Sequence, residues 1–373
     1  MKKTLVWFLI LAMALTLFPA TAGAAGTPDD GARDLALLEE EMRQALYAAN
    51  DRRYSEDAPQ EEHYDPDEVI RVIVELEAAP AVDEDCRNRG RESIRADESR
   101  TVCPVCPHAC SLSEGQRGLC RARIAQSGEV ASENYGRLTS IALDPIEKKP
   151  LARFRPGAFV TSVGSYGCNL HCPFCQNASI ACAGLDDVRW RFVAPEALVD
   201  LAVRTRGSIG IAYTYNEPFV GFEYLRDTAR LAHDAGLANV VVTNGMVNEG
   251  PLREVLSLID AANVDLKGFS QRFYDIVGGD LETVERTIRL MAACPTCHLE
   301  VTTLVIPGMN DDEREIEEAA AWLASIDPSI PYHLTRFFPC HRMADKQPTP
   351  LEALRSLATV ARRHLDDVLL GNC

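Results

Sequence analysis

Three cysteines, Cys168, Cys172 and Cys175, lie within the stretch GCNLHCPFCQN (167–177). Their spacing is C-x3-C-x2-C, and no fourth cysteine follows at a ligand-like interval. Four cysteines close a structural zinc site or an ordinary iron–sulfur cluster. Three cysteines leave one coordination position of the metal centre open, and an open position can bind a reacting molecule. The spacing therefore predicts a metal centre that takes part in chemistry.

A second group of cysteines comes earlier, in TVCPVCPHACSLSEGQRGLC (101–120). Its members are Cys103, Cys106, Cys110 and Cys120, with the spacing C-x2-C-x3-C-x9-C. We call this group the cysteine knuckle and expect it within a small segment, residues 99–158. Four closely spaced thiolates favour a closed, tetrahedral structural site for zinc or iron. Disulfides and unliganded thiols are the alternatives.

From residue 159 onward, short apolar runs alternate with helical patterns. Buried strands separated by helices indicate βαβ units and a parallel sheet. Six units are too few for a closed eight-stranded barrel, so the pattern predicts an α/β fold with a partial (β/α)6 barrel of the TIM type over residues 159–373. The expected strands are 159–163, 209–213, 239–243, 263–266, 299–306 and 332–335. The expected helices are 195–206, 219–235, 251–259, 281–293, 312–326 and 350–364.

The expected strand ends are conspicuously polar. They carry YTYNEP (213–218), TNG (243–245), DLKG (265–268), IPGMND (306–311) and HLTRFFP (333–339). In parallel α/β folds the working residues lie where strands end and helices begin, so we expect these side chains to meet the triple-cysteine loop. Asp265 and Lys267 share one face of a strand and would be costly to bury without a partner. A charged ligand at the barrel mouth is therefore expected.

A site-differentiated 4Fe–4S cluster would account for these residues. The three cysteines of the loop would hold three irons, and the fourth iron would bind the amino and carboxylate groups of an amino-acid cofactor. In this hypothesis Glu217 accepts a hydrogen bond from the ammonium group. Lys267, with His333 or Arg336, holds the carboxylate.

Other residues of the same stretches have weaker predictions. Thr243 and Asn244 suit contacts with a ribose or a substrate, and Phe174 would lie against an aromatic ring of the cofactor. His108 and His171 lie beside cysteines, either as further ligands or donors or as exposed neighbours. Isolated cysteines are interpreted as small apolar residues, with an auxiliary role considered only for the last: Cys86, Cys182 and Cys340.

The cysteine loop after the first strand of a partial barrel resembles the signature of radical S-adenosylmethionine (SAM) enzymes. This resemblance covers residues 159–373. It implies a 4Fe–4S cluster that delivers an electron to the sulfonium of SAM, which gives methionine and a 5′-deoxyadenosyl radical. The stretches YNEP, TNG and DLK are similar to those of the branch that contains the pyruvate formate-lyase activating enzymes. The resemblance does not identify the substrate.

Four longer stretches narrow this resemblance. CPVCPHACSLSEGQRGLCRAR, DPIEKKPLARFRPG (144–157), GCNLHCPFCQNASI and HLTRFFP together resemble the AmmeMemoRadiSam-system radical SAM enzymes. This resemblance implies Memo-like and AMMECR-like proteins as partners. An electron donor such as a ferredoxin or a flavodoxin is also implied. The N-terminal 98 residues are extra to the family pattern.

Those N-terminal residues have two parts. Residues 1–25 resemble a signal peptide or an anchor, with Lys2 and Lys3 before an apolar run and a small-residue cleavage-like site. Residues 26–98 form an acidic, partly helical extension that holds most of the formal net charge of −17. The acidity argues against a nucleic-acid partner. The signal-like start favours export or a membrane tether, whereas the cofactor chemistry favours the cytoplasm.

Three alternative functions stay open. The first is an activase that forms a glycyl radical on a protein backbone. The second is an exported c-type haem protein, because CPTCH (294–298) has the haem-attachment pattern C-x-x-C-H. The third is a non-catalytic, exported cysteine-rich protein in which both cysteine groups are disulfides or zinc sites.

Overall fold

The computed structural model describes residues 100–373. The signal-like segment 1–25, the acidic extension 26–98 and Cys86 therefore lie outside the described residues. No helix within residues 100–373 is long and apolar enough to cross a membrane.

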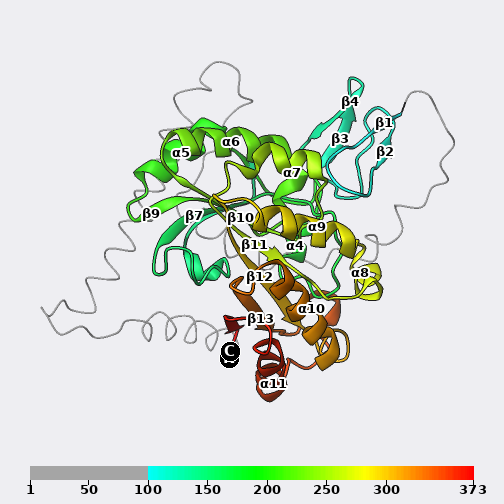
Figure 1. The fold of residues 1–373 in the computed structure, drawn as a ribbon. Coiled ribbons are helices and arrows are strands. Elements are labelled where there is room, and N and C mark those ends of the chain that lie inside the picture. Colours follow the sequence, from blue (N-terminus) through cyan, green and yellow to red (C-terminus); the bar gives the residue numbers. More distant parts are fainter. Residues whose placement is uncertain (1–99) are drawn as a thin grey trace, which may run out of the picture. The chain divides into compact units, whose positions relative to one another are not determined.

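The core is an eight-stranded sheet with the order β14-β13-β12-β11-β10-β9-β7-β6 (Figure 1). Every neighbouring pair from β7 to β14 is parallel, and β6 pairs with β7 in the antiparallel direction. The sheet is open, with β6 and β14 at its edges. Its strands are β6 (Ser140–Pro145), β7 (Phe159–Gly164), β9 (Ser208–Tyr213), β10 (Ala238–Thr243), β11 (Ala261–Asp265), β12 (His298–Val305), β13 (Tyr332–Arg336) and β14 (Val368–Gly371).

Helices connect the parallel strands and pack along one face of the sheet (Figure 1). Alternate residues of the strands face this helical layer, as the period of two requires, and Ile211, Val241 and Val301 belong to the large core that they share with it. The helices are α4 (Ala178–Ala181), α5 (Pro195–Arg204), α6 (Phe222–Asp234), α7 (Glu249–Leu256), α8 (Gln271–Val277), α9 (Leu281–Ala292), α10 (Glu313–Ile326) and α11 (Leu351–Ala361). Short 3-10 helices are η3 (Ile146–Lys148), η4 (Pro218–Gly221) and η5 (His341–Met343).

The other face of the sheet has its own small core. Val160, Ala212 and Val240 of three adjacent strands pack there against Ile146 and Leu151. Those two residues come from the segment between β6 and β7, so this segment covers the inner face of the sheet. The lead-in thus packs against part of the inner face of the partial barrel.

The cysteine-rich segment consists of short antiparallel pairs. Strand β1 (Thr101–Val102) pairs with β2 (Ser111–Leu112), and β3 (Arg123–Gln126) pairs with β4 (Glu129–Ser132). A third pair joins β5 (Arg137–Leu138) to β8 (Arg191–Phe192), beside the barrel. In Figure 1 the first two pairs lie together, next to α7.

The α/β fold and the six predicted parallel strands are confirmed, and two further strands of this sheet were not among those six. Strand β14 adds a seventh parallel strand beside β13, formed by the apolar run near the end of the sequence. Strand β6 adds an antiparallel edge within the lead-in, where Asp144 and Pro145 obscured the strand pattern. Helix α8 was also missed, because its seven residues are too few for a clear period.

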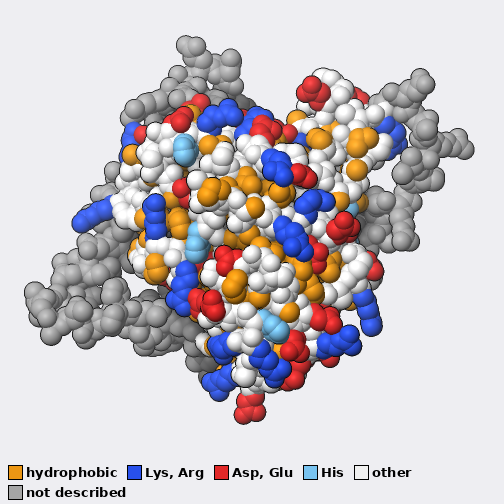
Figure 2. All heavy atoms as spheres, in the orientation of Figure 1, with side chains coloured by type: hydrophobic (Ala, Val, Ile, Leu, Met, Phe, Trp, Pro, Cys, Tyr) orange, Lys and Arg blue, Asp and Glu red, His pale blue; other side chains and the backbone are white. Residues whose placement is uncertain are grey.

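The surface carries charges of both signs. Figure 2 shows basic and acidic side chains interspersed over the visible face of the described residues, with small apolar patches between them. No large area of one sign appears on this face.

Candidate active site

The three cysteines of the loop 167–177 follow β7 directly; Cys172 is buried, and Cys168 and Cys175 are partly buried. The sulfur of Cys168 accepts the backbone N–H of Leu170 at 3.4 Å and the Asn244 amide at 3.5 Å. Burial raises the pKa of the Cys175 thiol to about 12 and also raises the pKa of Cys168 and Cys172. A metal must therefore displace protons from this loop when it binds.

Glu217 lies after β9 and is buried, with 3% of its surface exposed. Its Oε1 accepts hydrogen bonds from the backbone N–H of Phe219 and the hydroxyl of Thr243, and its Oε2 accepts one from the backbone N–H of Asn244. Burial raises the pKa of Glu217 to about 7, against the effect of these donors. A carboxylate has about four acceptor positions, so one position on Oε2 is left for a further donor.

Thr243 and Asn244 have different surroundings. The Thr243 hydroxyl donates to Glu217 and accepts the backbone N–H of Gly245, so it holds the loop rather than facing an open space. The Asn244 amide nitrogen instead lies between Cys168 and the side-chain oxygen of Asn169. Of these two predicted contacts, the structure brings only the Asn244 side chain to the cysteine loop.

Lys267 follows β11 and forms an ion pair of 2.6 Å with Asp265. Burial lowers its pKa, but Asp265 and the thiols of Cys172 and Cys175 outweigh burial and raise the pKa above its ordinary value. Its ammonium group thus lies within electrostatic range of two loop cysteines. The structure thus brings Lys267 near the cysteine loop, and its contact with a cofactor carboxylate stays a prediction.

The structure does not bring His333 to the loop. His333 is the second residue of β13, and its Nε2 lies 2.5 Å from Glu300 Oε2. Glu300 is the third residue of β12 and also accepts the backbone N–H groups of Ala152 and Arg153 in the lead-in. Both residues are near the amino ends of their strands, whereas the cysteine loop follows the carboxyl end of β7.

Arg336 and Phe174 were also predicted to contact the cofactor, and in the structure both contact other protein groups. Arg336 donates from Nε to the carbonyl of Thr349, and its guanidinium lies over the ring of Phe338. Phe174 is buried against Phe273, with 6.0 Å between the ring centroids.

The cysteine knuckle packs directly on the cysteine loop. His108 Nε2 lies 2.8 Å from the carbonyl oxygen of Asn169, the residue after Cys168. Burial raises the pKa of Cys106 to about 11, and a hydrogen bond from the Asn169 side chain opposes that rise. Asn169 was not predicted as a site residue, although it stands inside the quoted cysteine motif.

Within residues 100–373, no three Cys, His, Asp or Glu side chains converge where a single metal ion could bind. The four knuckle thiols lie close enough to affect one another electrostatically, and a metal bound by all four stays a prediction. The same finding does not count against an iron–sulfur cluster at the cysteine loop, because each cysteine of such a cluster binds a different iron. All twelve cysteines of the described part are free, so neither group is a set of disulfides.

The residues of the haem-attachment pattern at 294–298 contact other protein groups. His298 Nε2 lies 2.9 Å from Glu300 Oε1, and its ring stacks on Phe154. Cys297 is buried, and Cys294 lies near the carbonyl of Leu256. These contacts are those of a structural region at the amino end of β12.

Tyr215 extends from the Glu217 loop along the inner face of the sheet. Its backbone has a left-handed φ of 71°, and its hydroxyl donates to Asp144 at 2.5 Å. The buried Lys149 also pairs with Asp144 and lies over the Tyr215 ring. Sequence reasoning missed this group of three, because Asp144 and Lys149 stand in the lead-in and not at a parallel strand end.

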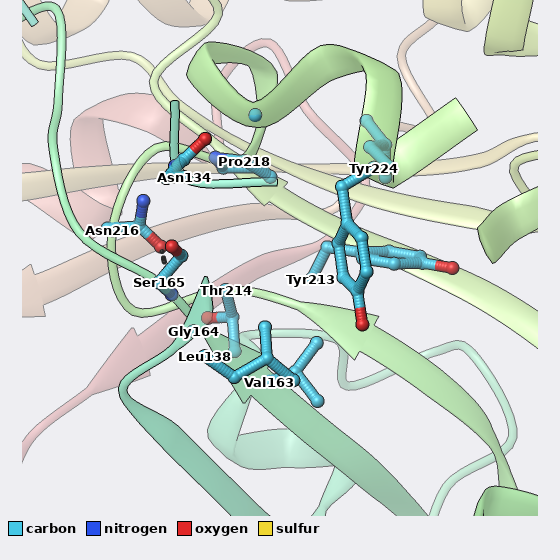
Figure 3. A pocket seen from close by; sticks show the side chains of 12 residues that line it. Asn134, Leu138, Val163, Gly164, Ser165, Tyr213, Thr214, Asn216, Pro218 and Tyr224 are labelled. Carbon is cyan, nitrogen blue, oxygen red and sulfur yellow. Dashed lines mark hydrogen bonds between the residues drawn. The ribbon is translucent and has the colours of Figure 1, made fainter. Parts of the chain in front are cut away.

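A small cavity lies between the sheet and α6, behind the Glu217 loop (Figure 3). Asn216 and Ser165 lie on one side of it, joined by a hydrogen bond, and Tyr213 and Tyr224 lie on the other. Its volume of about 30 Å³ has room for a water molecule. This cavity is too small for a nucleoside cofactor.

These residues fit the binding of an iron–sulfur cluster. Three buried or partly buried cysteines share one loop, the sulfur of Cys168 has two N–H donors, and a lysine and a carboxylate with a spare acceptor position lie nearby. Hydrogen bonds to cysteine sulfurs and the burial of a cluster set its reduction potential. The arrangement can hold a cluster and a zwitterionic ligand beside it.

Comparison with known proteins points to one superfamily. The profile of the radical SAM superfamily matches residues 162–323, which include the cysteine loop, Glu217, Asn244 and Lys267. An uncharacterized protein of Methanocaldococcus jannaschii is 35% identical over 280 residues, covering 74% of this chain and 83% of the relative. A second protein of that organism, named as a candidate glycyl-radical enzyme activating enzyme, is 26% identical over 217 residues, covering 55% of this chain and 85% of its own length.

Solved structures give more distant matches. A domain of a pyruvate-formate lyase-activating enzyme from Bacteroides vulgatus is 22% identical, with a TM-score of 0.38, covering 44% of this chain and 99% of that domain. A radical SAM methyltransferase from Sphaerobacter thermophilus is 16% identical, with a TM-score of 0.44, covering 58% of this chain and 67% of that protein.

Proposed function

The chain belongs to the radical SAM superfamily, and from this membership we propose that it cleaves SAM reductively at a 4Fe–4S cluster bound by Cys168, Cys172 and Cys175. When bound, the cluster supplies the electron that cleaves SAM to methionine and a 5′-deoxyadenosyl radical, which takes a hydrogen atom from a substrate. The observation that carries the proposal is the three-thiol loop with Lys267 beside it and no fourth cysteine.

The chain's own residues would orient SAM beside the cluster. The spare acceptor position of Glu217 would take a hydrogen bond from the ammonium group, and Lys267 would pair with the carboxylate. Bound next to the Glu217 carboxylate, the ammonium would favour its ionised form. Asn244 would keep its N–H on the sulfur of Cys168 and so hold the loop in place.

The knuckle is proposed as a second metal site, with Cys103, Cys106, Cys110 and Cys120 as its ligands. Zinc and iron are the candidates, and metal analysis of the purified full-length chain distinguishes them. A single zinc ion would bind all four thiolates tetrahedrally, whereas a polynuclear iron–sulfur centre would bind each thiolate through a different iron.

The four sequence stretches described above support an assignment to the AmmeMemoRadiSam-system enzymes. On this proposal the partners are Memo-like and AMMECR-like proteins, with a ferredoxin or a flavodoxin as the reductant. The chemistry of the cofactors favours the cytoplasm as the place of the reaction, whereas the signal-like residues 1–25 favour export or a membrane tether. None of these features identifies the substrate.

The test is formation of 5′-deoxyadenosine. The full-length chain is reconstituted anaerobically with iron and sulfide, and SAM and dithionite are added. We expect 5′-deoxyadenosine from the wild type and none from Cys172→Ala, while Cys297→Ala, which removes a buried thiol outside both groups, keeps the activity. A fully loaded wild-type cluster that leaves SAM intact would disprove the proposal.

A second candidate is activation of a glycyl-radical enzyme, which the candidate activating enzyme of M. jannaschii favours. In that reaction the hydrogen atom comes from a glycine Cα of a protein. Incubation with a glycyl-radical enzyme from the organism that encodes this chain would then give the doublet EPR signal of a glycyl radical. Absence of that signal, with 5′-deoxyadenosine still formed, would mean that the enzyme acts on a different substrate.

A further inference from the structure

Asn169 connects the cysteine knuckle to the cysteine loop. It is buried, with 4% of its surface exposed, and it follows Cys168 in the chain. Its carbonyl oxygen lies 2.8 Å from Nε2 of His108, and because a carbonyl only accepts, this nitrogen of His108 carries the proton. The knuckle thus holds the backbone immediately after one proposed cluster ligand.

The side chain of Asn169 extends the connection to the loop after β10. Its oxygen accepts the amide N–H of Asn244 at 2.9 Å, and its nitrogen donates to the carbonyl of Met246 at 2.6 Å. The same Asn244 amide nitrogen lies 3.5 Å from the sulfur of Cys168. Asn169 therefore fixes the group that donates to this sulfur.

Two further contacts join the same three segments. The backbone N–H of Asn248 donates to the carbonyl of Val105 at 2.8 Å, and its side chain donates to the carbonyl of Pro104 at 2.7 Å. A Cβ atom on Gly167 would lie 2.5 Å from the carbonyl oxygen of Cys120. The knuckle therefore touches the cysteine loop on one side and the Asn244 loop on the other.

We infer that Asn169 is a positioning residue through which the knuckle sets the place of Cys168 and Asn244, and thereby the reduction potential of the centre that the cysteine loop holds. This inference rests on the proposed cluster. An N–H donor to a cysteine sulfur stabilises the reduced, more negative state of a cluster and raises its potential. Loss of the Asn169 contacts releases that donor, so the potential falls.

The experiment is a reductive titration of the reconstituted full-length chain followed by EPR. We expect Asn169→Ala and His108→Leu to load iron and sulfide like the wild type, but to show a lower midpoint potential and an altered EPR spectrum. His108→Gln, which retains an N–H donor, restores values near the wild type. Arg117→Ala is the matched control, because it breaks a surface ion pair with Glu133 in the same segment without touching the cysteine loop.

The outcomes separate this inference from the proposed function. A wild type without a cluster at the cysteine loop would remove the proposed function and the inference together. A wild type that cleaves SAM, with Asn169→Ala and His108→Leu titrating at the wild-type potential, would overturn the inference alone. If Asn169→Ala does not fold, the pair His108→Leu and His108→Gln decides, because the His108 side chain is only half-buried.

Discussion

The backbone N–H of Asn244 donates a hydrogen bond of 2.8 Å to Oε2 of Glu217, which ties the loop after β10 to the loop after β9. The same residue places its side-chain amide on the sulfur of Cys168. One asparagine thus joins the carboxylate and the cysteine loop that the proposed chemistry requires.

Glu217→Gln is expected to weaken SAM binding by about tenfold to a hundredfold. A hydrogen bond to a charged group contributes about 1.5–3 kcal/mol, and the amide places a donor where the ammonium needs an acceptor. The measurement is calorimetric titration of the cluster-loaded chain with SAM. Glu315→Gln is the control, since Glu315 also accepts a backbone N–H, from Phe269, but lies on α10. Wild-type affinity in Glu217→Gln would remove Glu217 from the proposed cofactor contacts.

Lys267→Gln is expected to raise the KM for SAM by at least about tenfold, because it removes the cation proposed to pair with the cofactor carboxylate. Lys267→Arg keeps the charge and should lose less. Both variants are compared in the 5′-deoxyadenosine assay at several SAM concentrations. A Lys267→Gln enzyme with an unchanged KM would show that Lys267 serves only Asp265.

Glu300 gives a pH dependence in the acid range. Burial alone would raise its pKa, but hydrogen bonds from His298, His333 and the lead-in backbone lower it to about 2, from the ordinary 4.5. A lowered pKa contributes stability that is present above pH 4.5 and is lost as the pH falls toward 2. The difference corresponds to about 3 kcal/mol of unfolding free energy.

Urea unfolding of the full-length chain between pH 3 and pH 7 measures this contribution. We expect the wild type to lose stability as the pH falls below 4.5 more steeply than Glu300→Gln does. Glu318→Gln, which alters an exposed glutamate paired with Arg314, should follow the wild-type curve. Parallel curves for wild type and Glu300→Gln would contradict the assignment.

Gly167→Ala tests the close packing of the knuckle on the cysteine loop. Gly167 has φ of +89°, and an added Cβ would also meet Cys120 and Ala122 at 2.5 and 2.6 Å. Gly128 has a similar φ of +80° with open space around it, so Gly128→Ala bears only the conformational cost of about 1–2 kcal/mol. We expect Gly167→Ala to be less stable than Gly128→Ala and to load less iron.

Urea midpoints and iron content of both glycine variants are measured side by side. Equal stability and equal iron content would mean that the knuckle separates from the loop without consequence. That result would also weaken the coupling inferred through Asn169.

The sequence by itself determined the features that depend on neighbours along the chain. The spacing of Cys168, Cys172 and Cys175 predicted one loop with three thiols, because ligands three and four residues apart need only a turn to meet. The alternation of apolar runs and helical patterns predicted the parallel sheet, since buried strands and amphipathic helices have distinct periods. Glu217 and Lys267 were predicted at the site because both follow the carboxyl ends of parallel strands.

Only the tertiary structure decided the features that depend on strand register and on long-range packing. His333 was predicted at the cofactor, but β13 begins at Tyr332, so its second residue lies at the amino end and meets Glu300. The contact of His108 with Asn169 joins residues 61 positions apart, and no local pattern encodes it. The role of Thr243 in holding Glu217 likewise depends on two strands packing side by side. A side chain's partner across a sheet is set by the register of the strands, which a single sequence does not contain.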